Sequence, residues 1–342
     1  MSEATFTVPL LKSDDELMGR MSEPSPQVVE AVSKIDDEVM ILGVGGKMGP
    51  TIAQMLVRAG KGNVLGVDLF PNPGPQEYLD SVGVKTVKCD LMDAEAVRAL
   101  PEAPNVLLMV GFKFGASGNP ALTWGVNSLL PANLMQRFPE SRTVYVSSGN
   151  VYKFTPLGPG AKETDPVEPI GEYAMSRLAG ERLVEFCAQR NSTPTCIARL
   201  FYATELRYGI VCDVATKIKN RQAIDVSMGH VNQLWQGDAA GYFLQLFPLC
   251  ASPARVINMT GLEVLAIRDL ATKLGDLMGV EPIIEGDESD TALLGDSTEL
   301  ASLLGPPPTS LDHVIEWVAW WVMNDMTSLG KPTKYERRDG KF

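Results

Sequence analysis

The feature that most constrains the fold is a regular alternation of short apolar runs and helix-like segments between residues 38 and 201. Six runs read as strands, at 38–45, 63–70, 85–90, 105–111, 142–149 and 193–201. Helical segments are predicted between most of them, at 46–60, 93–101, 119–139 and 171–186. Strands that alternate with helices predict a parallel sheet whose two faces are both covered by helices.

The loop between the first strand and the first helix is rich in glycine. Its sequence GVGGKMG places Gly43, Gly46 and Gly49 where backbone N–H groups can approach a pyrophosphate at a helix N-terminus. The second strand ends in Asp68, an acid that can accept hydrogen bonds from both ribose hydroxyls and would repel a 2′-phosphate. The pattern predicts NAD binding in preference to NADP, although Lys47 favours the phosphorylated cofactor. The alternative is a tight turn that binds nothing.

After residue 201 the alternation becomes irregular. A further strand is predicted at 256–261, with amphipathic helices at 263–279 and 310–325. Ahead of the first strand, a short helix is predicted that starts near Pro24 or Pro26. We therefore expect an α/β protein with a Rossmann-type doubly wound parallel sheet and a smaller C-terminal substrate-binding region. The expected division is an extension at 1–36, a dinucleotide-binding domain at 37–201 that also receives 232–262 and 308–326, a substrate region at 202–231 and 263–307, and a tail at 327–342.

Charge and composition exclude several other classes of protein. The formal net charge of -12 argues against nucleic-acid and anionic-membrane partners. The five cysteines include no C-x-x-C pair, and neither of the two histidines has a partner at metal-ligand spacing, so no metal site is predicted. No signal peptide is recognisable, and the longest apolar run, 317–323, is too short to span a bilayer. We expect a cytoplasmic protein that acts on a small molecule.

The segment GEYAMSRLAGERLVEF at 171–186 carries a phenol and a guanidinium on one helix face. Tyr173 and Arg177 are four residues apart, which is about one helical turn. A tyrosine can take the proton of a substrate hydroxyl if nearby positive charge favours its phenolate. Tyr173 is therefore a candidate general acid/base, unless the pair simply lies on a solvated helix face.

Several motifs in the order expected of one family now support a resemblance. They are the glycine loop, CDL at 89–91, VGFKFG at 110–115, WGVNSLL around Asn127, VSSGNVY from 146, EYAMSRLAGERLVE from 172, RLFYATE from 199 and LLGPPPTSLDHVIEWVAWW from 303. Over about residues 38–326 the chain resembles the extended short-chain dehydrogenases/reductases of the NAD-dependent epimerase/dehydratase group. The resemblance implies an NAD(P)-dependent epimerase, dehydratase or dehydrogenase, and the motifs do not distinguish these reactions.

The resemblance also implies roles for individual residues. The catalytic set is Tyr173 as general acid/base, Ser148 as the group that orients the substrate oxygen, Arg177 as the cation near tyrosine and ribose, and Asn127 as an anchor for a relay water. The implied cofactor-binding set comprises Gly43, Gly46, Lys47, Met48, Gly49, Asp68, Leu69, Asp90, Leu91, Val110, Gly111, Lys113, Tyr173 and Arg177.

The chain departs from this family at Arg177, where the family has lysine. Arginine keeps the positive charge and the donors, but it is effectively never deprotonated. A relay that passes a proton through this position would be lost, while electrostatic support of the phenolate would survive. A protein that binds NAD without catalysis, as a sensor or scaffold, is the alternative.

A second departure affects the substrate half. Nucleotide-sugar epimerases carry an asparagine at the position of Tyr202 and an arginine at that of Val231, and both help to hold a diphosphate. We therefore predict a small sugar, sugar acid or polyol-like substrate without a nucleotide. The expected substrate-binding residues are Ser148, Asn150, Tyr202, Asn232 and Gln236, with Trp235 as an apolar wall and Asp238 as a helix N-cap. A nucleotide-sugar epimerase or dehydratase with an unusual diphosphate site stays open.

The resemblance suggests a homodimer as well. In this family the helices that match 121–138 and 171–189 often pair with their copies. Leu129, Leu130, Leu134, Leu178 and Val184 suit such a contact, but the same residues would also suit packing on the sheet.

Overall fold

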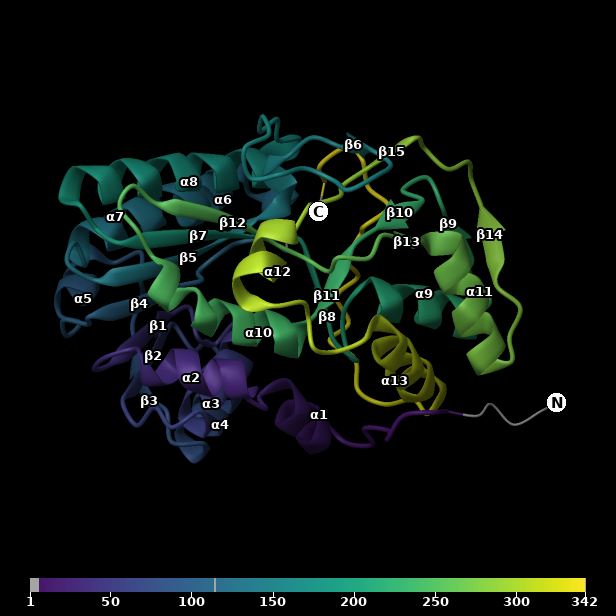
Figure 1. The fold of residues 1–342 in the computed structure, drawn as a ribbon, viewed down its shortest axis with the longest axis horizontal. Coiled ribbons are helices and arrows are strands. Elements are labelled where there is room, and N and C mark those ends of the chain that lie inside the picture. The colour runs from purple at the N-terminus through teal and green to yellow at the C-terminus, as the bar shows by residue number, and fades with distance from the viewer. Residues whose placement is uncertain (1–5, 114, 342) are drawn as a thin grey trace.

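A seven-stranded, wholly parallel sheet forms the larger part of the molecule (Figure 1). The computed structural model describes residues 6–113 and 115–341. The strands lie in the order β12-β7-β5-β4-β1-β2-β3. Their bounds are β1 (Val39–Leu42), β2 (Val64–Asp68), β3 (Lys85–Lys88), β4 (Asn105–Leu108), β5 (Arg142–Ser148), β7 (Thr195–Leu200) and β12 (Arg255–Met259). The predicted Rossmann-type fold is confirmed.

Helices cover both faces of the sheet because successive strand residues point to opposite sides. In β1, Val39 and Ile41 are buried in one apolar cluster, whereas Met40 and Leu42 are buried in another. Figure 1 shows the two layers, with α6, α7 and α8 on one face and α2, α3 and α4 on the other. Their bounds are α2 (Pro26–Ser33), α3 (Gly49–Arg58), α4 (Pro73–Ser81), α5 (Ala94–Arg98), α6 (Pro120–Trp124), α7 (Leu130–Arg137) and α8 (Gly171–Asn191).

Two local features differ from the pattern predicted for this part of the chain. The segment 71–81 has a composition typical of a loop, yet residues 73–81 form α4. Pro73 stands at the start of this helix, where the N–H group that proline lacks would have no partner within the helix. The predicted helix at 119–139 is interrupted by one π-helical turn, Gly125–Leu129, between α6 and α7. This turn carries Asn127.

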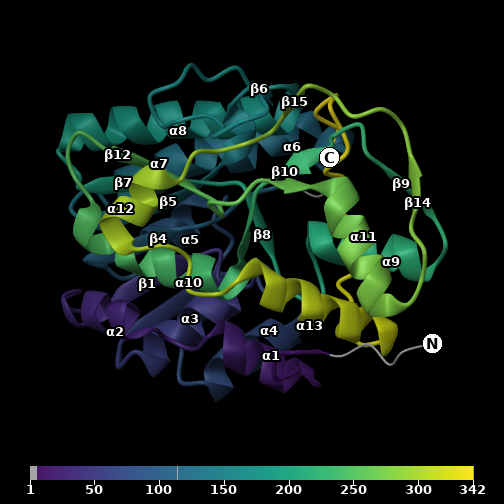
Figure 2. The same cartoon turned by 45° about the vertical axis from the view of Figure 1, so that its right-hand side comes forward.

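The C-terminal region packs three helices together beside the sheet (Figure 2). These are α9 (Ile210–Lys219), α11 (Ile267–Met278) and α13 (Leu311–Met323). Within residues 308–326, α13 packs against α9 and α11. Residues 232–262 contain α10 (Gln236–Gln245) and strand β12 of the sheet. The domain division predicted from the sequence stays a prediction.

Short elements connect this region. The paired strands are β6 (Thr155–Pro156) with β15 (Thr291–Ala292), β8 (Tyr202–Thr204) with β11 (Gln233–Trp235), β9 (Ala223–Asp225) with β14 (Ile283–Glu285), and β10 (His230–Val231) with β13 (Leu265–Ala266). Single helical turns are η1 (Ala116–Gly118), η3 (Gly149–Val151) and η4 (Phe247–Leu249), and α12 (Thr298–Leu304) precedes α13.

The segments before and after the predicted domains both pack onto the fold. α1 (Asp14–Met21) and α2 lie against α10, and α2 starts at Pro26, as predicted. Residues 327–341 run back from α13 past α9 to the start of α8. Among residues 6–113 and 115–341, no helix is long and apolar enough to cross a membrane.

Candidate active site

A cleft of about 240 Å³ lies at the carboxyl ends of the sheet strands, next to the glycine loop. This is where parallel α/β sheets bind their ligands. It brings together ten of the predicted site residues: Gly43, Gly46, Lys47, Met48, Gly111, Lys113, Ser148, Tyr173, Arg177 and Tyr202. The other lining residues are Met109, Val146, Ser147, Leu200, Phe201, Ala203, Tyr208, Gly209, Ile210 and Thr333.

The glycine loop has the shape of a cradle that side chains would fill. Gly43 has a φ of +92°, and a Cβ there would lie 2.9 Å from Val110 Cγ2. Gly49 begins α3, and a Cβ there would collide with the Val44 carbonyl. The backbone therefore approaches the end of β4 and the helix N-terminus as closely as a bound pyrophosphate requires, so these residues fit a dinucleotide.

The acid at the end of β2 holds the same loop. Asp68 Oδ2 accepts a hydrogen bond from the Gly45 N–H at 2.9 Å, and Oδ1 accepts one from the Phe70 N–H at 3.2 Å. Each carboxylate oxygen keeps further acceptor capacity for a ribose hydroxyl. Asp68 therefore lies beside the cradle, at the position from which it could read an adenosine ribose.

The other predicted adenine-side residues lie at the ends of β2, β3 and β4, outside the lining of the cleft. Leu69 is about half exposed and Leu91 is buried. Asp90 accepts a hydrogen bond from the Met92 N–H at 2.9 Å, and Val110 is part-buried beside Gly43.

Lys47 extends from the glycine loop across the cleft to the C-terminal region. Its Nζ donates to the Ala203 carbonyl at 3.2 Å and lies 3.9 Å from the ring centroid of Tyr208. Burial lowers the pKa of Lys47 to about 7, an effect that the buried carboxylate of Glu205 opposes. The side chain thus points towards β8, whereas Asp68 stands at the end of β2.

Tyr173 and Lys113 meet in the cleft. Tyr173 is the third residue of α8, and Lys113 belongs to the loop that follows β4. The Lys113 Nζ lies 5.8 Å from the ring centroid of Tyr173. Burial lowers the pKa of Lys113, and its charge interaction with Tyr173 raises it again in part.

Arg177 is buried, and its guanidinium is held by the main chain. It donates to the Val110 carbonyl at 3.2 Å and to the Val146 carbonyl, and it lies 5.2 Å from the ring centroid of Tyr145. A Cβ at Gly111 would lie 3.0 Å from Arg177 Nη1, which explains the glycine there. Arg177 therefore joins the loop after β4 to strand β5.

Ser148 ends β5 and is nearly buried. Its hydroxyl donates to Asn150 Oδ1 at 3.0 Å and accepts from the Asn150 N–H at 3.2 Å. It lines the same cleft as Tyr173, so a substrate oxygen that meets the tyrosine can also reach this hydroxyl. The predicted pairing of Ser148 and Tyr173 in one site is consistent with this geometry.

Asn127 lies behind the cleft rather than in it. Its side-chain amide donates to the Phe112 carbonyl at 3.1 Å and to Ser176 Oγ at 3.0 Å, and its oxygen accepts from the Phe112 N–H at 2.8 Å. The side chain is fully buried. Asn127 thus holds the loop that carries Lys113, and its predicted part in a water relay stays a prediction.

Three predicted substrate residues do not line the cleft, since Asn150 borders only the neighbouring small cavity and Asn232 and Gln236 lie away from both. Asn232 Nδ2 donates to the Gly295 carbonyl at 2.6 Å, and Asn232 Oδ1 accepts from the Gly295 N–H at 3.3 Å. Gln236 is buried at the start of α10, with its Nε2 3.5 Å from the sulfur of Met21. The reason is that β10, β11 and α10 turn these side chains into the packing between the sheet and the C-terminal region.

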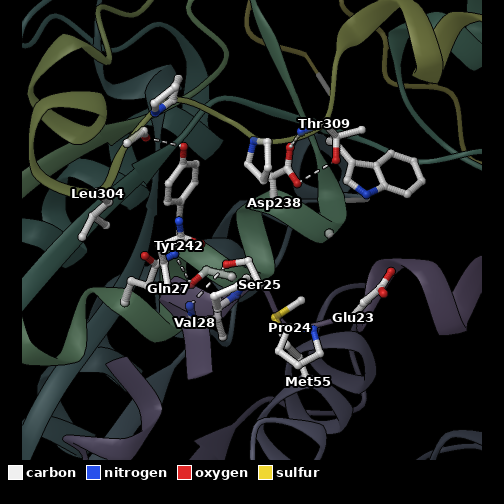
Figure 3. A pocket seen from close by; sticks show the side chains of 18 of the residues that line it. Glu23, Pro24, Ser25, Gln27, Val28, Met55, Asp238, Tyr242, Leu304 and Thr309 are labelled. Atoms are coloured by element: carbon white, nitrogen blue, oxygen red, sulfur yellow. Dashed lines mark hydrogen bonds between the residues drawn. The ribbon is translucent and has the colours of Figure 1, made fainter. Parts of the chain in front are cut away.

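The end of α10 that carries Gln236 borders a different cavity, of about 470 Å³. Figure 3 shows it between α10 and the segment that carries Glu23, Pro24 and Ser25. Asp238 accepts hydrogen bonds from the Thr309 N–H at 3.0 Å and the Thr309 hydroxyl at 2.9 Å. The predicted N-cap role of Asp238 is wrong, because α10 begins two residues earlier, at Gln236. Burial raises the pKa of Asp238 to about 6.

Behind the site lies a buried ion pair that the sequence motifs did not reveal. Glu181 of α8 and Arg199 of β7 are 0% and 2% exposed, and Arg199 Nη2 lies 2.7 Å from Glu181 Oε2. Glu181 also accepts a hydrogen bond from Ser147, the neighbour of Ser148, and Arg199 donates to the hydroxyl of Tyr152. The sequence offered one signal for this ion pair: a charged residue stands inside a predicted helix, Glu181, and another inside a predicted buried strand, Arg199.

Residues 333–340 pack beside the cleft and border a neighbouring cavity. The Thr333 N–H donates to Asp213 Oδ2 at 2.7 Å, and Thr333 lines the cleft. Arg338 donates to the Thr291 carbonyl at 2.8 Å and lies 4.2 Å from the ring centroid of Phe154. At the far end, a Cβ on Gly171 would lie 2.6 Å from the Gly340 carbonyl oxygen, so the backbones are in close contact.

The segment 333–340 leaves little room beyond the cleft. Arg337 and Gly340 line, with Asn150 and Tyr202, a cavity of only about 10 Å³. The segment therefore rests on the first residue of α8, two positions before Tyr173.

Comparison with known proteins now bears on this site. Residues 39–205 match the sequence model of the NAD dependent epimerase/dehydratase family. The predicted resemblance to a family of NAD-dependent epimerases and dehydratases is thereby confirmed, and the match covers the glycine loop, Asp68, Ser148 and Tyr173.

Solved structures of this kind share the fold at low sequence identity. The UDP-glucuronic acid 4-epimerase of Bacillus cereus, solved in complex with NAD, has a TM-score of 0.71 and 16% identity, over 84% of this chain and 99% of its own. The UDP-Glc/GlcNAc 4-epimerase of Campylobacter jejuni gives 0.72 and 17%, over 84% and 100%. The dTDP-glucose 4,6-dehydratase DesIV of Streptomyces venezuelae, with NAD bound, gives 0.72 and 16%, over 84% and 98%. A search of curated protein sequences finds no significant match.

Proposed function

We propose that this protein catalyses NAD-dependent hydride transfer at a hydroxyl-bearing carbon of a small sugar, sugar acid or polyol-like substrate. The observation that carries the proposal is the meeting of the glycine cradle, Ser148 and Tyr173 in one cleft beside which residues 333–340 pack. The family match supports the cofactor and the class of reaction. The packing of residues 333–340 beside the cleft supports a substrate of limited size.

The cradle residues would hold the cofactor. Gly43, Gly46 and Gly49 leave room for the pyrophosphate at the N-terminus of α3, and Asp68 would accept hydrogen bonds from the adenosine ribose. Its carboxylate would repel a 2′-phosphate, so we propose NAD rather than NADP. When bound, the nicotinamide ring supplies an acceptor for a hydride from a carbinol carbon, and a donor for its return.

The chain itself manages the proton. As Tyr173 phenolate, the side chain takes the proton of the substrate hydroxyl, and it gives the proton back when the carbonyl is reduced. The Ser148 hydroxyl binds the same oxygen and fixes its direction. Asn150, bonded to Ser148 on both sides, orients that hydroxyl.

The charge of the cleft supports a substrate without a diphosphate. Its cations, Lys47, Lys113 and Arg177, come from the glycine loop, the loop after β4 and α8, which are the elements that face the cofactor. On the substrate side the lining is neutral or apolar, with Tyr202, Phe201 and Thr333. Among the described lining residues, this wall contributes no cationic side chain of its own, although Lys47 reaches it from the glycine loop. A buried diphosphate needs cations or several N–H donors.

Nucleotide sugars are the second candidate. All three solved structures above are enzymes named for a UDP-sugar or for dTDP-glucose. If residues 333–340 move aside, the region next to Asn150 and Arg337 would open. This candidate predicts micromolar binding of UDP-glucose.

The two candidates, and a protein that binds NAD without catalysis, separate in one pair of measurements. We expect NADH absorbance to rise with at least one member of a panel of sugars, sugar acids and polyols. We also expect no heat of UDP-glucose binding in calorimetry. Micromolar UDP-glucose binding would refute the proposed substrate class. NAD binding with no turnover of any panel member or of UDP-glucose would favour a sensor.

The homodimer and the cytoplasmic location remain predictions. Leu130, Leu134 and Val184 are buried inside the chain, so they cannot form a dimer surface. Apolar side chains that α6, α8 and the π turn do expose are Leu122, Trp124, Leu129, Met175, Leu183 and Phe186. The helices α6 and α8 lie side by side, which supports the predicted contact between copies.

A further inference from the structure

We infer that the cation that supports the Tyr173 phenolate in this protein is Lys113, and that Arg177 instead ties strand β5 to the loop that carries Lys113. This inference rests on the proposed role of Tyr173 and deepens it. It divides between two residues a task that one lysine on α8 would perform. Lys113 does not contact the reacting atoms in this account; it acts by stabilising the charge of the Tyr173 phenolate.

The geometry of Arg177 commits its hydrogen-bond donors elsewhere, although its charge remains. Nη1 and Nη2 donate to the carbonyls of Val110 and Val146, and the guanidinium lies over the ring of Tyr145. The side chain is 3% exposed, and its Nε has no hydrogen-bond partner among the described residues. A guanidinium held in this way by two strand ends is a structural tie, and it cannot release a proton.

The geometry of Lys113 points its charge at the tyrosine. The Nζ is 5.8 Å from the centre of the Tyr173 ring, and both side chains line the cleft. An ammonium is compact, titratable and able to turn its three donors towards a phenolate. Burial lowers the pKa of Lys113, which brings it closer to the range in which it can exchange a proton.

The loop that presents Lys113 is fixed from behind. The N–H and the carbonyl of Phe112 are both bonded to Asn127, and Asn127 is bonded to Ser176 of α8. Arg177 crosses beneath the same loop at Val110 and Gly111. Lys113 is thereby held at a constant distance from α8, the helix that carries Tyr173.

Other titratable groups face this pair and must be considered in a titration. Lys47 lies across the cleft and its charge opposes that of Lys113. Tyr145 and Tyr208 interact with Tyr173, and burial raises the pKa of both, so their phenols titrate at higher pH. Arg177 stays charged throughout and contributes a constant field.

The test is a titration of the Tyr173 phenolate by near-ultraviolet absorbance on the NAD-saturated protein. The signal of Tyr173 is the difference between each variant and the same variant with Tyr173→Phe. A unit charge at about 6 Å in an effective dielectric of 20–40 shifts a titration midpoint by about one to two pH units. We therefore expect Lys113→Met to raise the midpoint by that amount, and Lys113→Arg to restore most of it.

The matched control removes a lysine of equal charge that does not line the cleft. Lys153 is half exposed and paired with Glu168 at 2.8 Å, so Lys153→Met should leave the midpoint unchanged. Arg177→Lys should shift it less than Lys113→Met does. An unchanged midpoint in NAD-saturated Lys113→Met, with an intact circular dichroism spectrum, overturns the inference. If Arg177→Lys does not fold, the comparison of Lys113→Met with Lys153→Met still decides.

This experiment needs no substrate, so it separates the two proposals. A shifted midpoint in a protein that turns over nothing would sustain the role of Lys113 and refute the proposed function. An unshifted midpoint in an active enzyme would do the reverse.

Discussion

The affinity for NAD should depend on pH through Lys47. The side chain leaves the glycine loop that would hold the pyrophosphate, and it ends at the Ala203 carbonyl and the Tyr208 ring. Burial lowers its pKa to about 7, so it loses its charge as the pH rises through neutrality. A bound anion favours the charged form, so it raises this pKa and couples NAD binding to proton uptake.

The size of the effect follows from the charges. A negative charge at about 6 Å, in an effective dielectric of 20–40, interacts with the ammonium by about 1–3 kcal/mol. This corresponds to a rise in the pKa of Lys47 of about one to two units and a change in affinity of about 10- to 100-fold. The affinity should be constant below about pH 6 and should weaken progressively between about pH 7 and pH 9.

Groups near Lys47 set the background of this experiment. Glu205 and Arg207 are paired with each other at 3.2 Å, and burial holds the pKa of Cys212 well above its usual range. Burial also lowers the pKa of Lys113, so this lysine can contribute to the slope as well. Only the part of the slope that Lys47→Met removes belongs to Lys47.

The assay is calorimetry of NAD binding from pH 6 to pH 9 in two buffers of different ionisation enthalpy. The native protein should take up about 0.5 to 0.8 proton per NAD near pH 7–8, and Lys47→Met should take up almost none. Lys153→Met is the matched control and should behave as the native protein. Constant affinity with no proton uptake in the native protein would refute the reasoning.

Three further substitutions test other parts of the structure. Arg199→Met leaves the Glu181 carboxylate buried without its partner and should cost about 3–5 kcal/mol of unfolding free energy in denaturant titration; adding Glu181→Leu should recover more than half of it. Asp68→Asn keeps an acceptor for the Gly45 N–H but removes the charge, so the preference for NAD over NADP should fall by about tenfold or more in binding assays, and an unchanged ratio would contradict the role of Asp68. Gly49→Ala places a Cβ against the Val44 carbonyl and should abolish measurable NAD binding, with intact binding as the contrary result.

The parallel sheet could be predicted because its signal is local. Each buried strand is a short apolar run, and each is followed by a turn and an amphipathic helix, so the chain order almost determines the layers. The helix α4 was missed since its segment, PGPQEYLDS, has the composition of a loop. Proline at the start of a helix is compatible with that helix, so the composition of this segment did not exclude α4.

Most residues predicted to bind the cofactor meet in the cleft, whereas of the predicted substrate residues only Ser148 and Tyr202 do. Gly43, Lys47, Ser148 and Tyr173 lie at the ends of regular elements, so the topology of the sheet brings them together. Asn232 follows two-residue strands whose direction depends on tertiary packing, and it turns to Gly295. A residue in an irregular region carries no periodicity from which its orientation can be derived.

Long-range contacts explain the remaining differences. Residues 333–340 pack beside the cleft through contacts with Asp213, Thr291 and Gly171, which are far away in the sequence. The bonding of Arg177 to two strand ends likewise depends on where β4 and β5 separate. Neither follows from spacing within one helix.

The most direct test of the account is the rate of NADH formation in the native protein and in Tyr173→Phe, under NAD saturation and with a substrate that the panel yields. The phenylalanine keeps the ring and removes only the hydroxyl, so NAD affinity should stay within about twofold, while the rate should fall by about 100-fold or more. A variant that retains the native rate would contradict the assignment of Tyr173 as the general acid/base of this site.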